Sequence, residues 1–581
     1  MKKAILLAVA VALLWGVTAE AAKPRVPLGN PPGAGRNDHF HQTWDRTLSP
    51  DTVYTLYGLY YVDSTYALTV PAGTVIEGDT VGTLTIKRGA KGYFLGEICN
   101  PVVMTSIKPP TQRARGDWGG LVICGAALST RPWTTKIEGG IVDAQFGGPD
   151  PDDDSGVYKY LRVEYPGFRF QLNDEINGIT LGAVGYGTEF HHVQVSYAFD
   201  DQFEFFGGTM DIHHCVAFGG TDDEFDTDFG YNGKAQFLFG LRDPFFWDAQ
   251  GESRGFESDG DFTGVPQWTR PIYANVTLIG PRRENGTLIP PGTTFEWSAV
   301  PREGSRLSLF NSVLMGYPLG ISMRDQSRDF ACSGDLVWEN VSLQAETFDS
   351  DPTGAGCPEG AGVSHVHDES RWPCPDPICG LGIKDWFDNV AVNSTSSTTR
   401  LPNAIGLVDM SNLNDPDPRP APGSEPATAG VSWTHPYLQI DGFFDQSPTY
   451  RGAFDPDLPM YAQWTRCWTN FDPQNTDYSD GVTPTAVTSD GAAPMKDVVL
   501  ENHPNPFNPT TTIRFSVPAA GHVTVQVFTV RGELVSTVLD RDMSAGVFEE
   551  VFNAAGLSTG TYFYRITGNG FTKTAKMVLL K

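Results

Sequence analysis

Residues 188–209, TEFHHVQVSYAFDDQFEFFGGT, and residues 210–231, MDIHHCVAFGGTDDEFDTDFGY, align without a gap at a spacing of 22 positions. A histidine pair, an aspartate pair, a phenylalanine and a glycine recur at matching places in the two segments. The matched positions are His191-His192 with His213-His214, Asp200-Asp201 with Asp222-Asp223, Phe203 with Phe225, and Gly208 with Gly230. A repeat of this length, with short strands and sharp turns, is typical of one coil of a parallel β-helix.

A second pattern, an asparagine followed by alternating apolar residues, extends the prediction along the chain. The residues that begin it are Asn275, Asn311, Asn340 and Asn389, with His192 and His214 in the same frame. Their irregular spacing indicates loops of different length between coils. Stacked coils would align these side chains, where amides can hydrogen-bond along the stack. A large antiparallel sandwich is the alternative fold, but it does not explain the gapless register of the repeat.

Composition and charge narrow the class of protein. The 581 residues include 63 Gly, 43 Pro and 35 Phe, which suits an all-β protein with many turns. A net charge of −28 argues against binding of nucleic acid or anionic lipid through bulk electrostatics. Calcium or another cationic partner is easier to accommodate, and simple solubility is the competing interpretation.

The N-terminus has the features of a secretory signal peptide at residues 1–22. Lys2-Lys3 is a charged start, residues 4–17 are apolar, and residues 18–22 (TAEAA) offer a cleavage site with small residues. The apolar run is too short to span a bilayer, and we expect no membrane span later in the chain. The protein is therefore predicted to be exported.

The last 85 residues predict a small antiparallel β-sandwich. Alternating apolar runs at 512–517, 523–528 and 562–566 are separated by glycine-containing turns. Pro504-Asn505-Pro506-Phe507, residues 527–532 (VFTVRG), Gly560-Thr561-Tyr562 and the lysine-rich last strand resemble the type A sorting domain of the type IX secretion system. The resemblance implies that the type IX secretion machinery is a partner, and that the protein is secreted or displayed on the outer cell surface after Sec export.

Motifs of the main region resemble a second family. They are Gly116-Asp117-Trp118-Gly119-Gly120, Phe146-Gly147-Gly148, residues 200–208 (DDQFEFFGG), residues 255–261 (GFESDGD) and residues 450–454 (YRGAF). In this order they look like a group of exported bacterial right-handed β-helix proteins described as multidomain lipoprotein-like. The resemblance covers about 45–470 and implies a fold but no activity.

We therefore predict an all-β protein in which a right-handed parallel β-helix precedes a small immunoglobulin-like β-sandwich. The predicted segments are a signal peptide at 1–22, a β-helix domain with caps and loop insertions at 23–468, a linker at 469–496 and the sorting domain at 497–581.

Eight cysteines in an exported chain favour disulfides, although eight allow 105 pairings. Cys332 with Cys357 and Cys374 with Cys379 are the local pairs that we expect. Zinc is the alternative for the cluster of Cys357, His365, His367, Cys374 and Cys379, but its spacing fits no standard zinc module.

Carboxylates repeated in consecutive coils are the clearest chemical signal. Coils about 4.8 Å apart bring such groups together, and they repel unless a cation or a proton is shared. Calcium binds several oxygens at 2.3–2.6 Å, which stacked Asp and Glu side chains can supply. The candidate calcium ligands are Asp200, Asp201, Glu204, Asp222, Asp223, Asp226, Asp228, Asp259 and Asp261.

Cleavage of a glycan is a second interpretation. An inverting hydrolase needs an acid and a carboxylate about 6.5–9.5 Å apart, and histidine can assist proton transfer. The candidate catalytic residues are Asp200, Asp201, Asp222, Asp223 and His213. A lyase would also need a cation for a uronate, and the nearest are Lys234 and Arg242.

The third interpretation is structural. Aspartates at coil turns cap backbone N–H groups, and each histidine pair places one ring inward and one outward. Structural and calcium roles together outweigh catalysis. We expect a secreted or cell-surface protein with a structural, adhesive or glycan-binding role, with a polysaccharide hydrolase or lyase as the alternative.

Overall fold

The computed structural model describes residues 22–31, 33, 39–171, 174–249, 251–260, 268–281, 293–347, 383–392, 394–397, 404–410, 412–482, 500–517, 521–543, 546–568 and 571–581. The predicted signal peptide (except Ala22), Asp261 and the cysteine–histidine cluster at 357–379 lie outside these ranges.

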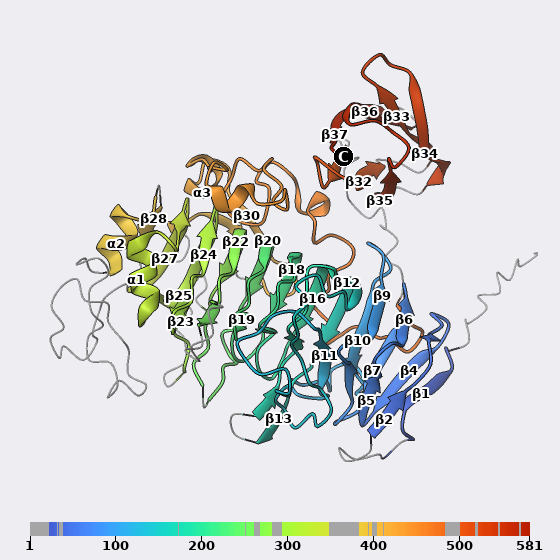
Figure 1. Ribbon diagram of the computed structural model, residues 1–581, viewed down its shortest axis with the longest axis vertical. Coiled ribbons are helices and arrows are strands. Elements are labelled where there is room, and N and C mark those ends of the chain that lie inside the picture. The colour runs from blue at the N-terminus through green and yellow to red at the C-terminus, as the bar shows by residue number, and fades with distance from the viewer. Residues whose placement is uncertain are drawn as a thin grey trace, which may run out of the picture.

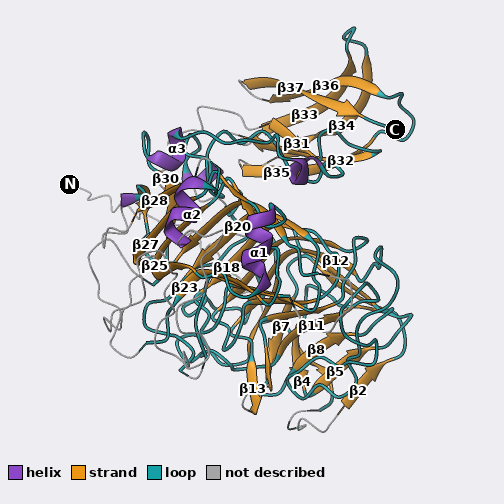
Figure 2. Cartoon of the chain, turned by 60° about the vertical axis from the view of Figure 1, so that its left-hand side comes forward, coloured by secondary structure: helices purple, strands orange, loops and turns teal. Residues whose placement is uncertain are grey.

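The main domain is a parallel β-helix whose coils wind through three ladders of parallel strands (Figure 1 and Figure 2). Ladder A contains β1 (Arg25–Gly29), β4 (Val53–Tyr57), β7 (Val75–Gly78), β10 (Val102–Ser106), the second halves of β12 (Gly156–Glu164), β16 (Glu189–Ser196), β18 (Ile212–Phe218), β20 (Lys234–Leu241) and β22 (Ile272–Ile279), then β25 (Val313–Ile321), β27 (Ser342–Thr347) and β28 (Thr395–Ser397). Ladder B contains β2 (His39–Gln42), β5 (Leu59–Val62), β8 (Thr83–Ile86), β11 (Gly120–Cys124), β15 (Ile179–Gly182), β17 (Phe203–Phe206), β19 (Phe225–Asp228), β21 (Phe256–Asp259), β23 (Trp297–Arg302) and the end of β25. Ladder C contains β3 (Arg46–Thr47), β6 (Ala67–Pro71), β9 (Lys91–Leu95), the first halves of β12, β16, β18, β20 and β22, then β24 (Ser308–Phe310) and β26 (Trp338–Glu339).

The register of the ladders confirms the predicted repeat. Phe203 pairs with Phe225 in ladder B, and His191 pairs with His213 in ladder C. The rings of Phe203 and Phe225 stack with centroids 5.2 Å apart inside an apolar column that runs through the domain. Because each coil repeats the same inward positions, like side chains lie on like side chains, and the core grows by stacking.

From β12 to β27, the coils turn from ladder C into ladder A at a residue with a left-handed backbone. These residues are Tyr160, His192, His214, Phe237, Asn275, Asn311 and Asn340, with φ between 47° and 58°. Asparagine tolerates this conformation better than most residues. As predicted, amides bond along the stack: Asn340 Nδ2 donates to Asn311 Oδ1 at 3.0 Å. Asn389 was predicted to belong to this series, but it ends α2 (Ile383–Asn389) instead.

The same turn decides where the histidine pairs lie. A left-handed residue breaks the in–out alternation of a strand, so two consecutive side chains can share the outer side. The inner members of the two pairs lie against the extension on the outside of the β-helix: the ring of His192 is 5.6 Å from that of Trp468, and the ring of His214 is 5.2 Å from that of Trp464. The prediction that one ring of each pair points inward is therefore wrong.

Residues 404–482 form an extension that packs back along the outside of the β-helix, drawn in orange in Figure 1. Asn311 Nδ2 donates to the Ser432 carbonyl at 3.2 Å, and Asn470 contacts Gln194 through two bonds at 2.8 Å. Tyr478 is buried and donates to Glu164. The first part of the segment predicted as a linker, up to residue 482, thus lies against the domain.

The remaining short elements of the domain lie either in the extension or in loops between coils. The extension contains β29 (Leu407–Asp409), β30 (Asp417–Pro420), α3 (Glu425–Thr428), η3 (Pro436–Gln439) and η4 (Met460–Ala462). The loops between coils contain α1 (Gln326–Ser333), α2 and the hairpin of β13 (Phe168–Gln171) and β14 (Asp174–Ile176).

A disulfide that the sequence did not indicate, Cys99–Cys467, joins the extension to the turn between β9 and β10. Cys332 is disulfide-bonded as well. Its expected partner Cys357, and the expected pair Cys374–Cys379, lie outside the described residues. Cys124 and Cys215 are free and buried in the core, so the even number of cysteines does not mean that all are paired.

The C-terminal region forms two antiparallel sheets, compatible with an immunoglobulin-like sandwich. One contains β31 (Leu500–His503), β32 (Thr510–Val517) and β35 (Gly546–Asn553); the other contains β33 (Gly521–Thr529), β34 (Leu534–Met543), β36 (Gly560–Gly568) and β37 (Phe571–Leu579). The three predicted strands fall within β32, β33 and β36. Their alternating apolar residues form a separate core.

Candidate functional site

The outer side of ladder B carries acidic side chains in successive coils. Phe203 and Phe225 face the core, so strand alternation turns Glu204 and Asp226 outward. Glu204 pairs in register with Asp226, and Asp226 with Glu257 of β21. Neighbouring strands lie about 4.8 Å apart, so the fold forces these carboxylates together.

The turns that lead into β17 and β19 add two aspartate pairs. We call Asp200, Asp201, Glu204, Asp222, Asp223 and Asp226 the acidic face. Asp201 Oδ1 accepts a hydrogen bond from the Asp223 backbone N–H at 2.8 Å, and Asp223 Oδ1 accepts from the Arg254 N–H at 2.5 Å. These two bonds are the capping contacts that a structural role predicts.

Capping does not use all the oxygens of the acidic face. Two carboxylate triads, Asp200–Asp201–Asp222 and Asp201–Glu204–Asp226, each have one oxygen per residue within 4.8 Å of the others. Asp201 belongs to both triads. Buried Oδ1 atoms of Asp222 and Asp226 have no hydrogen-bond partner within the part of the chain that the structure describes. Such atoms are unusual in folded proteins and can mark an ion or water site.

Burial and mutual repulsion act together on the acidity of these groups. Burial is the first cause that raises the pKa of Asp201 well above its usual value, and the neighbouring Asp223, Asp226 and Asp222 raise it further. The pKa values of Asp200, Glu204, Asp222 and Asp226 are raised for the same two reasons. Without a cation, the acidic face therefore takes up protons at a pH where exposed carboxylates are ionised.

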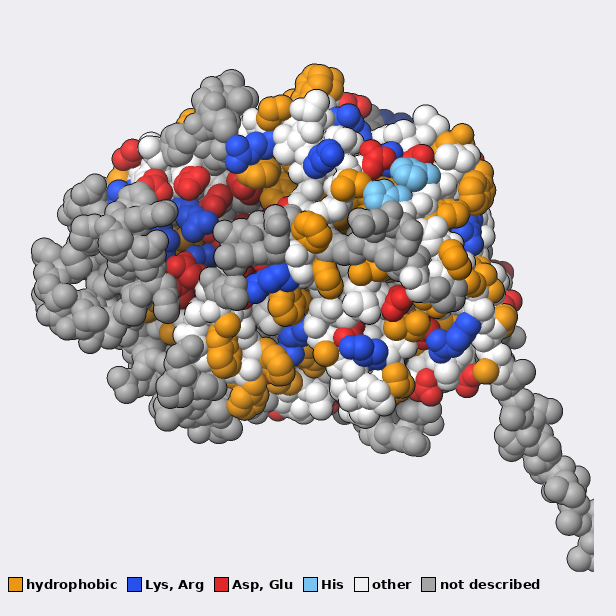
Figure 3. Space-filling model, turned by 90° about the horizontal axis from the view of Figure 1, so that it is seen from below, with side chains coloured by type: hydrophobic (Ala, Val, Ile, Leu, Met, Phe, Trp, Pro, Cys, Tyr) orange, Lys and Arg blue, Asp and Glu red, His pale blue; other side chains and the backbone are white. Residues whose placement is uncertain are grey.

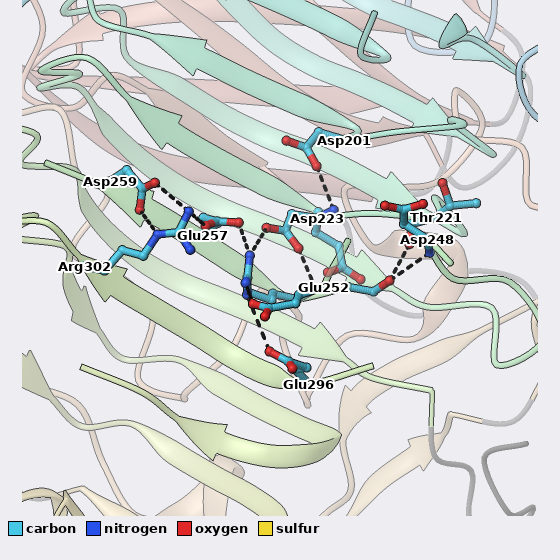
Figure 4. A network of polar contacts seen from close by, with 12 residues as sticks. Asp201, Thr221, Asp223, Asp248, Glu252, Glu257, Asp259, Glu296 and Arg302 are labelled. Carbon is cyan, nitrogen blue, oxygen red and sulfur yellow. Dashed lines mark hydrogen bonds and ion pairs between the residues drawn. The ribbon is translucent and has the colours of Figure 1, made fainter. Parts of the chain in front are cut away.

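Two arginines balance the charge at the other end of the face, as Figure 4 shows around Glu257. Arg302 binds both oxygens of Asp259, with bonds of 2.6 and 2.8 Å, and also contacts Glu257. Arg254 forms ion pairs with Asp223, Glu252, Glu257 and Glu296. Although burial opposes ionisation, Arg254 and Arg302 lower the pKa of Glu257 to about 2.

Comparison with known families agrees with the parallel ladders. Residues 40–363, more than half of the chain, match the family described as "Pectate-lyase like beta helix domain". The chain belongs to this family. Residues 502–580 match the family described as "Secretion system C-terminal sorting domain". The protein is therefore an exported member of the pectate-lyase-like β-helix family, directed to the cell surface or the extracellular space by its sorting domain.

Other comparisons add little. The Dettilon tailspike protein is a similar solved structure at 10% identity and a TM-score of 0.18; the match covers 56% of this chain and 60% of the tailspike chain, less than two thirds of its length. No curated protein matches the chain. Within the described ranges, no helix is both long and apolar enough to cross a membrane.

The β-helix separates residues that the sequence grouped as one catalytic set. Asp200, Asp201, Asp222 and Asp223 meet at the acidic face. His213 lies on ladder C, where its ring stacks on His191 and contacts Phe443. It therefore belongs to another side of the β-helix.

The remaining predicted ligands and cations also separate. Asp228 ends β19 and accepts a hydrogen bond from the Phe229 N–H at 2.5 Å, and Asp259 binds Arg302, so neither joins a triad. Asp261 lies outside the described residues. Lys234 pairs with Asp211 on ladder C, and Arg242 is buried against Glu224.

Sequence reasoning missed the cations of this β-helix site, Arg254 and Arg302, and the carboxylate of Glu257. The gapless repeat ends at residue 231, and the loop between β20 and β21 shifts the next coil out of register. The signal that could have found Glu257 is the likeness of the FESD motif of β21 to the FDTD motif of β19, two strands that pair side by side in the structure.

Proposed function

We propose that this protein is a secreted or surface-attached β-helix with a structural, adhesive or glycan-binding role, in which Ca²⁺ bound at the acidic face pins neighbouring coils together. The observation that carries the proposal is the pair of triads that share Asp201. Their members come from two successive coils, so one ion would link the coils that supply its ligands.

Electrostatics support a cation there. Two unit charges 4.8 Å apart, the upper limit within each triad, repel by about 3.5 kcal/mol at an effective dielectric constant of 20. Calcium prefers oxygen ligands and tolerates irregular geometry, so three carboxylates with further carbonyl or water oxygens fit its needs. Arg254 and Arg302 neutralise only the end of the face near Glu257.

Thermal unfolding of the mature full-length chain tests the calcium role. We expect the unfolding midpoint to fall when a chelator removes Ca²⁺ and to recover when Ca²⁺, but not an equal concentration of K⁺, is added back. An unchanged midpoint would remove calcium from the proposal and leave the capping role of the aspartates.

Charged side chains on one face of the molecule support a glycan-binding role. Figure 3 shows acidic and basic side chains gathered in a hollow on the face seen from below. Carboxylates and guanidinium groups placed side by side offer both acceptors and donors to sugar hydroxyls. A glycan array probed with the full chain, with and without Ca²⁺, tests this role, and the absence of any bound glycan would restrict the protein to structural functions.

One observation favours the alternative, a polysaccharide hydrolase. Asp223 and Glu257 hydrogen-bond to each other, yet their acidities diverge: burial raises the pKa of Asp223 well above its usual value, whereas Arg254 and Arg302 lower that of Glu257. Pairs of carboxyls with separated pKa values are typical of acid–base catalysis. Lyase chemistry has less support, because both arginines are already paired with carboxylates.

A glycan-release screen on the secreted chain separates the two roles. Release of oligosaccharide that is lost in Asp223→Asn, with the circular dichroism spectrum retained, would establish a polysaccharide-cleaving enzyme. The matched control is Asp540→Asn, an exposed aspartate of the sorting domain. No release from any tested polysaccharide supports the binding role.

A further inference from the structure

Four imidazoles form an array on the corner between ladders C and A, away from the acidic face. His192 and His214 are the left-handed corner residues of successive coils, so each lies on the same outer side as the histidine before it. Within each pair the Nδ1 atoms face each other: 2.8 Å separates His191 from His192, and 2.8 Å separates His213 from His214.

Stacking of the coils brings the two pairs together. The rings of His191 and His213 are parallel with centroids 4.8 Å apart, and those of His192 and His214 are parallel at 4.6 Å. One ring nitrogen from each of His191, His192 and His213 lies within 4.8 Å of the others. The repeat therefore concentrates nitrogen ligands in one small volume.

The neighbouring Glu189 prepares His191 for coordination. His191 Nε2 lies 3.0 Å from Glu189 Oε1. An ionised carboxylate accepts a proton and cannot donate one, so the His191 proton is on Nε2 and the lone pair is on Nδ1. A carboxylate behind the distal nitrogen is the common arrangement behind metal-binding histidines.

The surroundings shield the ring of His192 from water. His192 is buried, and its ring lies against Trp468, with centroids 5.6 Å apart. A neutral imidazole is the form that binds metal. His191, His213 and His214 are each partly exposed, whereas His192 is buried.

We propose that His191, His192 and His213, with His214 as a neighbouring fourth imidazole, bind a divalent transition-metal ion of the zinc and copper class. Bonds of about 2.0–2.1 Å to Zn²⁺ place two nitrogens of a tetrahedral site about 3.3 Å apart, so the 2.8 Å pair opens by about half an ångström when the ion replaces the shared proton. Rotation of the His213 ring brings the third nitrogen in. Imidazole nitrogens suit Zn²⁺ and Cu²⁺, whereas Ca²⁺ requires oxygen, so this site is chemically distinct from the acidic face.

Titration of the mature full-length chain with Zn²⁺, in saturating Ca²⁺ so that carboxylates are occupied, tests the proposal. We expect tight binding of Zn²⁺ by the natural chain, and binding at least tenfold weaker in His191→Gln and in His213→Gln. His522→Gln, which alters an exposed histidine of the sorting domain, is the matched control and keeps the natural affinity. Equal affinity in all four proteins would overturn the proposal.

Two further measurements guard against a folding defect in the histidine variants. Glu189→Gln leaves all four rings in place and changes a half-exposed side chain, so the fold is retained; loss of the carboxylate should weaken Zn²⁺ binding roughly 10- to 100-fold. Co²⁺ bound to nitrogen ligands in a tetrahedral site gives strong visible absorption bands. These bands should appear with the natural chain, disappear on addition of Zn²⁺, and be absent from His213→Gln; their persistence in that variant would refute the site.

Discussion

Asp201→Asn gives opposite results for a metal-free and a calcium-bound acidic face. Asp201 has an oxygen within 4.8 Å of a ligand atom from each of four other carboxylates, two in each triad. The asparagine amide oxygen can still accept the hydrogen bond from the Asp223 N–H, so the substitution removes the charge but keeps the cap. The change therefore isolates the electrostatic contribution.

The magnitude follows from the distances. One ionised pair at 4.8 Å costs about 3.5 kcal/mol at an effective dielectric constant of 20. Because raised pKa values keep several of these carboxyls protonated, we expect a net gain for Asp201→Asn of about 2 kcal/mol in chelator, less than one full pair. With Ca²⁺ at 100 times its Kd, each occupied site stabilises the natural chain by about 2.7 kcal/mol, and the variant should gain none of this.

Urea unfolding at constant ionic strength, with and without Ca²⁺, measures both effects. Urea is uncharged and leaves the electrostatic interactions unscreened. Asp540→Asn, which removes an exposed charge from the sorting domain, should match the natural chain in both conditions. An equal response to Ca²⁺ in the natural chain and Asp201→Asn, or a loss of stability of the variant in chelator, would refute the reasoning.

Other predictions concern the rest of the molecule. Burial raises the pKa of Glu224 to about 7, above its ordinary 4.5. The protonated side chain therefore contributes fully to stability below pH 4.5, and this contribution is lost as the pH rises through 7. Glu224→Gln should flatten the decline in stability against urea between about pH 5 and 8, and an unchanged slope would contradict this. Reduction of the Cys99–Cys467 disulfide, whose cysteines are 368 residues apart, removes a cross-link that stabilises the fold by up to about 5 kcal/mol. It should make the extension at 404–482 the first site of limited proteolysis. Asn311→Ala loses the side-chain hydrogen bonds of Asn311 at a left-handed corner and should lower the unfolding free energy by about 1–3 kcal/mol. Asn311→Gly loses the same hydrogen bonds but relieves the backbone, so its loss should be smaller. Equal losses in the two variants would assign the effect to the side-chain amide alone. Deletion of residues 500–581 should prevent the protein from crossing the outer membrane of a type IX-secreting host, so that cell fractionation finds it in the periplasm. Continued release into the medium would contradict a sorting role.

The repeat was sufficient to predict the stacking of residues that share a position in successive coils. Phe203 on Phe225, and the aspartate pairs of one coil beside those of the next, follow from the 22-residue spacing because each coil rises by one strand separation. The Asn ladder followed in the same way. Asn389 broke that rule because a local helix took its place.

Insertions limited the prediction of the site. Arg254 and Glu257 follow a loop that interrupts the repeat, so their register with the acidic face was not visible in the sequence. The predicted catalytic His213 failed to join the aspartates for a different reason. Positions of one repeat lie on different ladders of the same coil, and closeness in sequence does not place them on one side.

The sequence by itself determined the all-β class, the parallel coils, the sorting domain and the accumulation of carboxylates in consecutive coils, because each of these depends on a local period or motif. Only the tertiary structure decided which charges meet and which face is covered. The link between Cys99 and Cys467 and the arginines beside Glu257 depend on how loops close over the ladders. The outward position of both rings of each histidine pair depends on the left-handed backbone of His192 and His214. These are contacts between distant segments, or backbone conformations, that no residue pattern encodes on its own.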